Sequence, residues 1–387
     1  NNPYQYFFEQ MHMDDAIYAD ESIYEYPMQQ GGGNDGRPYS FGRPSSGGSK
    51  AAYPCKSYGQ GRINPAYFYG VFDPNDMRRD VSITMTGSNG KGVEKLIPFV
   101  PNSKAEGGGL TLNKWDENRQ ANPWVAAQRK SGINGPYMRM SEVYLGYAEV
   151  CAALGDVVTG KQYLKTVRER SFPQGLANTD AFIASFGNDL VRAIIEERGF
   201  EYAGEGDRRW TLIRSGYLPE DIKRIKDMTK AMMDGLATKG YYEFENGNII
   251  SAYIWTKLVD AKTIYGHRLT AQCPTDKVND PVLYPGWRGQ KDNWEEMGLN
   301  YGSSTPATNL AIKGLFEIVS EEEAASLESQ GYTKVNWGID LVDNRDEYDK
   351  YLFWDYDYVS APIYLWPFTP NVMAAGGFTN GYGFKQE

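Results

Sequence analysis

The feature that most constrains this chain is a block from residue 136 to residue 218 in which apolar and charged residues repeat at helical spacing. In its first segment the apolar or small residues recur three and four positions apart, which is typical of one buried helical face. Pro136 suits the first turn of a helix, and Gly155 readily takes the left-handed conformation that ends one. The pattern predicts a helix over 136–155. Its buried face is predicted to contain Met140, Val143, Tyr144, Tyr147, Ala148, Cys151 and Leu154.

A second helix is predicted from Gly160 to about Arg170, because Pro173 prevents it from continuing. The short connection predicts that the two helices lie side by side and antiparallel. Ala148 and Gly160 fall where tetratricopeptide repeats place small residues, which let two helix backbones approach closely. The two segments are therefore interpreted as one divergent helical-hairpin repeat.

Charged residues recur through the same block, and two interpretations of them are open. Paired carboxylates with arginines suit an acid and a base that act on a sugar or a phosphate. They equally suit ion pairs that tie three helices together, which is the usual role of such pairs and the favoured interpretation here. It predicts that Arg198 and Glu201 lie at a helix crossing, with partners from the segment 136–155. The residues concerned are Arg139, Glu142, Glu149, Glu197, Arg198, Glu201, Arg208, Arg209 and Arg214.

The order and spacing of these residues resemble the core signature of SusD/RagB-type surface proteins. The matching motifs are Arg139-x-x-Glu142-x-Tyr144-Leu145, Ala148-Glu149, Val167-Arg168-x-Arg170 and Glu197-Arg198-x-x-Glu201-x-x-Gly204-Glu205-Gly206-x-Arg208-x-Trp210. The C-terminal segment looks like a degenerate form of the family's closing segment, with Val372 where an acidic residue is common and Asn380-Gly381 in place of Asn-Pro. The resemblance covers 140–387 well and 1–139 loosely.

The resemblance implies a mainly α fold, a SusD-like α-α superhelix of TPR-like helical hairpins with long irregular loops and a few short β-hairpins. Residues 1–135 are expected to form a loop-rich region with short strands and helices, and 136–387 a helical region with a hairpin and loop insertion over 240–345. Family members are usually longer. We therefore expect that N-terminal helical repeats upstream of Asn1 are missing. Their absence would leave one face of the 136–170 hairpin exposed. The missing segment, or a separate fragment of the same protein, is then an expected partner.

Local signals predict further elements around this block. Glycine-centred turns predict hairpins about 87–90 and about Asn246-Gly247. Helices are predicted over 219–237 and over 321–330, the second ended by Gly331. Tyr24 and Tyr26 lie in a run that suits a short strand.

Composition narrows the classes of function. The net charge is −10 without a long basic run, which argues against nucleic acid as a partner. Neither histidine has the spacing of a zinc site or a catalytic triad, and no phosphate-binding glycine loop occurs, so no cofactor or metal is predicted. Asp73 and Asp76 lack the spacing of a calcium loop, which favours a capped turn. Cys151 is predicted to be a buried free thiol, and a bridge between Cys55 and Cys273 is the less favoured arrangement for the other two cysteines.

Aromatic residues point to a binding surface. The chain has 9 Trp, 29 Tyr and 16 Phe, many of them in glycine-rich segments that cannot place all of them in a core. Exposed rings stack on the apolar faces of sugars, although any single ring is as a rule folded back onto the core. Two loops are predicted to bind glycan, and the first is favoured. The fallback is the missing N-terminal region or the region around Trp115 and Trp124. The predicted ligand-binding residues are Tyr39, Phe41, Tyr53, Tyr58 and Arg62 in the first loop and Tyr284, Trp287, Arg288 and Trp294 in the second.

The family resemblance also implies a role for the whole protein. It implies a non-catalytic, lipid-anchored protein on the outer-membrane surface that binds oligosaccharide. Its expected partners are the glycan and a SusC-like TonB-dependent transporter that receives it. Two alternatives stay open: a peptide-binding RagB-type protein, and a glycoside hydrolase that uses Glu142 or Glu197.

Overall fold

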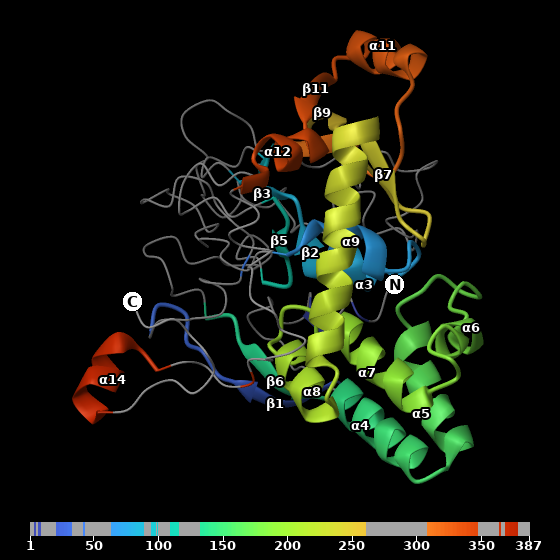
Figure 1. Cartoon of the computed structure of the whole chain (residues 1–387), viewed down its shortest axis with the longest axis vertical. Helices are drawn as coiled ribbons and strands as arrows, with labels where there is room; N and C mark the ends of the chain where they lie inside the picture. Colours follow the sequence, from blue (N-terminus) through green and yellow to red (C-terminus); the bar gives the residue numbers. More distant parts are fainter. Residues whose placement is uncertain are drawn as a thin grey trace.

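The computed structural model describes residues 4, 7, 8, 21–32, 42, 63–88, 94–97, 99, 109–115, 132–260, 308–346, 364 and 368–377. In this part of the chain helices dominate, and the strands are short and paired antiparallel (Figure 1). The mainly α fold predicted from the sequence is therefore confirmed. None of the helices in the described ranges is long and apolar enough to cross a membrane.

The predicted helical hairpin consists of α4 (Met140–Ala153) and α5 (Val157–Glu169). Leu145, Ala148, Leu164 and Val167 form its core together with residues of α6 (Thr179–Ala184) and α7 (Leu190–Glu201). The two backbones lie close at Gly160, where an added Cβ atom would lie 3.0 Å from the carbonyl oxygen of Ala148. The small residues thus perform the role that their spacing predicts.

Both helices begin at other residues than predicted. Gly135–Arg139 form the strand β6, which pairs antiparallel with β1 (Ser22–Tyr26), so α4 begins only at Met140. Strand pairing with a distant segment therefore outweighs the helix-start signal at Pro136. α5 begins three residues early, because the Asp156 carboxylate accepts a hydrogen bond at 3.1 Å from the Thr159 amide and so caps the helix.

The buried face of α4 also differs from the prediction. Ser141, Leu145, Ala148 and Cys151 are buried, and Cys151 is a buried free thiol as predicted. Val143, Tyr147 and Leu154, which were predicted to be buried, are exposed, Leu154 to 82%. Helical spacing fits two apolar faces on α4 and does not distinguish them. With Val150, the three exposed residues form the α4 stripe, at intervals of four, three and four positions.

The longest helix connects two parts of the fold. α9 (Leu218–Lys239) follows α8 (Arg208–Ser215) and runs from the helical block toward the β9 sheet (Figure 1). It packs on the predicted hairpin of β7 (Tyr241–Glu243) and β8 (Ile249–Ser251). The main core lies around its C-terminal half, and in that core the Trp337 indole donates a hydrogen bond of 2.8 Å to the Tyr69 hydroxyl.

The remaining elements are short. The hairpin predicted about residues 87–90 and the helix predicted before Gly331 are both confirmed. The antiparallel pairs are β2 (Ile83–Thr84) with β5 (Thr111–Leu112), β3 (Thr86–Ser88) with β4 (Glu94–Leu96), and β9 (Tyr253–Asp260) with both β10 (Thr308–Lys313) and β11 (Thr333–Asn336). The other helical segments are the π-helix Tyr67–Val71, α3 (Arg78–Ser82), α11 (Glu321–Ser329), α12 (Gly338–Asp343) and α14 (Pro370–Gly376).

We predict that Gly160→Leu lowers the melting temperature, because its Cβ would force apart the backbones of α4 and α5. Gly146→Leu is the matched control, since an added Cβ there meets no atom within 4 Å. Leucine forms helix better than glycine by up to about 1 kcal/mol, so the control should be neutral or stabilising. Thermal unfolding followed by circular dichroism measures both variants. Equal melting temperatures for the two variants would contradict the close packing.

Candidate functional site

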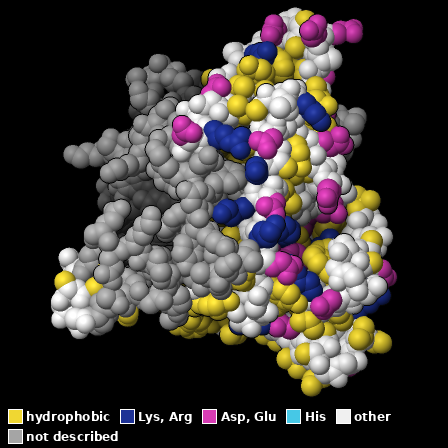
Figure 2. Space-filling view, viewed as in Figure 1, with side chains coloured by type: hydrophobic (Ala, Val, Ile, Leu, Met, Phe, Trp, Pro, Cys, Tyr) yellow, Lys and Arg dark blue, Asp and Glu magenta, His cyan; other side chains and the backbone are white. Residues whose placement is uncertain are grey.

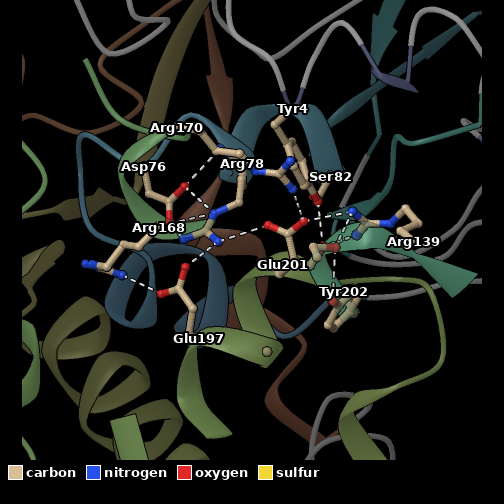
Figure 3. Close-up of polar contacts among 12 residues, drawn as sticks. Tyr4, Asp76, Arg78, Ser82, Arg139, Arg168, Arg170, Glu197, Glu201 and Tyr202 are labelled. Carbon is tan, nitrogen blue, oxygen red and sulfur yellow. Dashed lines mark hydrogen bonds and ion pairs between the residues drawn. The ribbon is translucent and has the colours of Figure 1, made fainter. Parts of the chain in front are cut away.

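Buried arginines and carboxylates from several segments converge around Glu197 and Glu201 of α7 (Figure 3). Arg78, fully buried on α3, donates hydrogen bonds to Asp76 at 2.7 Å, to Glu197 at 2.6 Å and to Glu201 at 3.2 Å. Asp76 belongs to the same turn, whereas Glu197 and Glu201 lie one helical turn apart on α7. One guanidinium group thus ties α3 to α7.

Arg139, the last residue of β6, is the second centre of this network. Its Nη1 atom lies 2.8 Å from both Glu201 and Glu21. Its Nε and Nη2 atoms bind the two carboxylate oxygens of Glu205 at 3.0 Å and 2.9 Å, a bidentate pair. The strand pair β1–β6 is therefore fixed to the C-terminal end of α7.

Two arginines at the end of α5 complete the buried network. Arg168 donates to Glu197 at 2.8 Å, and Arg170 donates to Glu201 and to Glu21, both at 2.6 Å. Glu197 is thus shared by two arginines and Glu201 by three. We use "buried network" for Glu21, Asp76, Arg78, Lys114, Arg139, Arg168, Arg170, Glu197, Glu201 and Glu205.

The electrostatics of the buried network lower the pKa of two of its carboxylates, Glu201 and Glu205. Burial by itself would raise the pKa of Glu201, but Arg170, Arg139 and Arg78 together hold it well below the ordinary value. Burial is likewise outweighed at Glu205, where Arg139 and Lys114 lower the pKa. Burial lowers the pKa of Lys114 to about 8, although its ammonium group lies 2.5 Å from Glu205.

A second set of ion pairs joins α4, α7, α8 and α9. Arg198 donates to Glu142 at 2.8 Å and to Asp207 at 2.5 Å. Arg208 binds Glu196 and Asp221, at 2.8 Å and 3.0 Å. Arg198 and Glu201 thus have partners in the segment 136–155, namely Glu142 and Arg139, as the sequence predicted.

The contacts of Glu197 and Glu142 indicate a structural role. Glu197 has no exposed side-chain surface, and each of its oxygens accepts from an arginine. Glu142 accepts from Arg198. A general acid or base must reach a substrate proton, which Glu197 does not in this arrangement. Among the described residues no group of three or more metal-ligating side chains occurs, and Asp73 caps its turn by accepting from the Asn75 amide at 2.8 Å.

All nine ligand-binding residues predicted from the sequence, in the loops 39–62 and 284–294, lie outside the described residues and stay predictions. So do Cys55, Cys273 and Trp124. Trp115 is buried, so its own ring is not available for stacking, and the fallback region around Trp115 and Trp124 stays a prediction.

Sequence reasoning missed a group of exposed rings on the strand pair β1–β6. Tyr24, Tyr26 and Tyr137 are all exposed, and the rings of Tyr24 and Tyr137 lie 5.7 Å apart, edge to face. The strand signal at Tyr24 and Tyr26 is confirmed by β1. That signal did not identify the partner strand, since Tyr137 lay in the segment predicted as helix.

We predict that Glu201→Gln removes about 3–5 kcal/mol of stability, because it leaves buried arginines without their shared charge. Glu149→Gln is the matched control: the side chain of its partner Arg214 is 46% exposed, so the loss should stay below about 1 kcal/mol. Urea unfolding measures both variants. A Glu201→Gln variant as stable as the control would contradict the structural role of the buried network.

Acid should weaken the fold through Glu201 and Glu205. Since their pKa values in the folded state lie below the ordinary 4.5, the unfolded state binds more protons between the folded and unfolded values. Their contribution to stability is therefore complete above pH 4.5 and is lost as the pH falls through the folded pKa values. Urea unfolding at pH values from 7 downward should show this decline below 4.5. The decline should be shallower in Glu205→Gln, and an identical slope would refute the assignment.

Comparisons with known proteins identify the family of this chain. The model of the SusD family matches residues 15–367. SusD-like protein P25 of Formosa agariphila is 28% identical over 160 residues, which are 41% of this chain and 26% of that protein. A SusD homologue of Bacteroides thetaiotaomicron matches with a TM-score of 0.42 and 19% identity, over 59% of this chain and 47% of that chain. Surface glycan-binding protein A of the same species, in complex with laminarihexaose, gives 0.39 and 18%, over 55% and 46%.

The chain spans about a quarter of the curated relative and under half of each of these two solved chains. The family model, by contrast, covers most of the chain, including every motif from Arg139 to Trp210 that carries the sequence resemblance. The resemblance is thereby confirmed, and the chain belongs to the SusD family.

Proposed function

We propose that this protein binds oligosaccharide or polysaccharide at the cell surface without catalysis and delivers it to a SusC-like TonB-dependent transporter in the outer membrane. Membership of the SusD family carries this proposal. A structure with laminarihexaose among the similar proteins fits a glycan ligand. Both the glycan ligand and the transporter are therefore proposed for this chain from its family membership.

The absence of turnover is part of the proposal. A glycosidase needs one carboxyl group that is protonated and one that is free to attack or to activate water. Glu197 is buried between Arg78 and Arg168, and the pKa of nearby Glu201 lies below the ordinary value. These side chains therefore support a scaffold role, and binding falls to the aromatic side chains.

The proposed setting follows the family as well. A lipid anchor in the full-length protein would hold the chain at the outer-membrane surface, above its transporter. The α4 stripe, which consists of Val143, Tyr147, Val150 and Leu154, supports packing by a further helix, because four apolar residues at this spacing suit a helical partner. The division of the chain at residue 135, with ligand-binding loops before it, remains part of the proposal.

We predict that Tyr53→Ala or Tyr58→Ala weakens glycan binding about fivefold or more, as the loss of a stacked ring would, with little change in melting temperature. Trp287→Ala should do so only if the second loop holds the ligand. Titration calorimetry of the parent against glycan and peptide panels comes first, and a peptide that binds where glycans do not would favour the RagB-type alternative. If all three variants bind like the parent, the loop site is refuted.

A further inference from the structure

The two-stranded sheet β1–β6 presents aromatic rings to solvent. We use "tyrosine ribbon" for its exposed tyrosines Tyr24, Tyr26 and Tyr137. Tyr24 and Tyr137 are 56% and 69% exposed, and their ring planes stand at 84° to each other. Hydrophobic side chains lie along the lower edge of the molecule in Figure 2, where Figure 1 places β1, β6 and α4. Tyrosine is intermediate in burial, so one exposed ring would be ordinary, but three exposed rings on one small sheet are a group that suits a binding surface.

Irregular strand pairing accounts for this exposure. The register between β1 and β6 shifts on both sides of Tyr24: Ser22 faces Arg139, Tyr24 faces Met138 and Glu25 faces Pro136. Ile23 and Tyr137 are thus the extra residues of two bulges. A bulge bends its strand and re-aims a side chain, and such bulges are frequent beside functional sites.

The end of the tyrosine ribbon next to α4 is fixed by the buried network. Arg139 and Arg170 both bind the carboxylate of Glu21, which directly precedes β1. The Met140 amide also donates to the Glu21 carbonyl at 2.7 Å. Neither strand can therefore shift at this end without breaking buried ion pairs.

The opposite end is fixed by one asparagine. The Asn134 side chain accepts from the Met28 amide at 2.8 Å and donates to the Glu25 carboxylate at 2.9 Å, so it bridges both strands. With both ends held, the rings are arranged before any ligand arrives, and binding does not have to order the backbone.

We propose that the tyrosine ribbon is a binding subsite for a neutral glycan, whose sugar rings stack on Tyr24 and Tyr137 while the phenol groups bond sugar hydroxyls. The inference rests on the proposed function and adds a subsite to it in the described part of the chain. Tyrosine suits this task, because it combines a flat apolar face with a polar tip. The α4 stripe offers mainly aliphatic side chains without polar tips and suits a helix instead.

Charge favours a neutral glycan over a sulfated or uronic one. The carboxylates that accompany the ribbon are Glu21 and Glu25, and the arginines beside Glu21, Arg139 and Arg170, are both already paired with carboxylates. The chain as a whole carries a net charge of −10. An anionic polysaccharide would therefore meet repulsion at this surface.

The test measures the affinities of ring-deleted variants by titration calorimetry. The parent is first titrated with neutral hexasaccharides of glucose, mannose and xylose and with one sulfated glycan. The best neutral ligand is then titrated into Tyr24→Ala, Tyr137→Ala, Tyr24→Phe and Tyr137→Phe. Trp210→Ala is the matched control, since Trp210 is an equally exposed ring (56%) on α8. Melting temperatures of all variants show that each is folded.

We expect each ribbon alanine variant to lose affinity about fivefold or more, the phenylalanine variants to keep most of it because the ring remains, and Trp210→Ala to match the parent. If the parent binds a glycan and both ribbon alanine variants bind it equally well, this inference alone is overturned. A parent that binds no glycan overturns the proposed function and the subsite with it. Tighter binding of the sulfated glycan than of any neutral one contradicts the assigned ligand class.

Discussion

A carboxylate buried among three arginines is the interaction on which the rest of this structure depends. Glu201 meets Arg78, Arg139 and Arg170 at 2.6–3.2 Å, each from a different segment. A buried charge is tolerated only when partners replace its water, so these segments must all be in place together. The result is an arrangement with little freedom, in which β6, α3, α5 and α7 are fixed relative to one another.

In that arrangement the carboxylates that the sequence offered as acid or base make ion pairs with arginines. Each carboxylate that resembled an acid or base in sequence is occupied: Glu197 by two arginines and Glu142 by Arg198. Tyr24, Tyr26 and Tyr137 are exposed on a strand pair that the ion pair of Arg139 with Glu21 holds in place. Under the proposed function, the charged side chains position the segments and the aromatic rings contact the ligand.

Short-range sequence patterns correctly predicted those elements that are determined by neighbouring residues. The helical hairpin, the turn at Asn246-Gly247 and the partners of Arg198 followed from spacing alone. The pairing of β1 with β6 did not, because Glu21 and Arg139 are 118 positions apart and the strand signal at either end is short. The inward face of α4 was mistaken because the helix is apolar on two sides, and only its neighbours decide which side is buried. Composition singled out the aromatic segments predicted as loops. It did not single out Tyr137, because that residue lies in a segment predicted to be helical.

The central claim is that the ion pairs are scaffold and the rings are the binding surface, and Arg198→Met tests it most directly. The carboxylates that Arg198 binds, Glu142 and Asp207, are not among the groups that fix the tyrosine ribbon, so its loss should weaken the joint between α4 and α7 without moving any ring. The measurement is melting temperature and glycan affinity on the same sample, with affinity expressed per folded molecule. The account predicts a lower melting temperature and an unchanged affinity. An unchanged melting temperature with lost binding would contradict it.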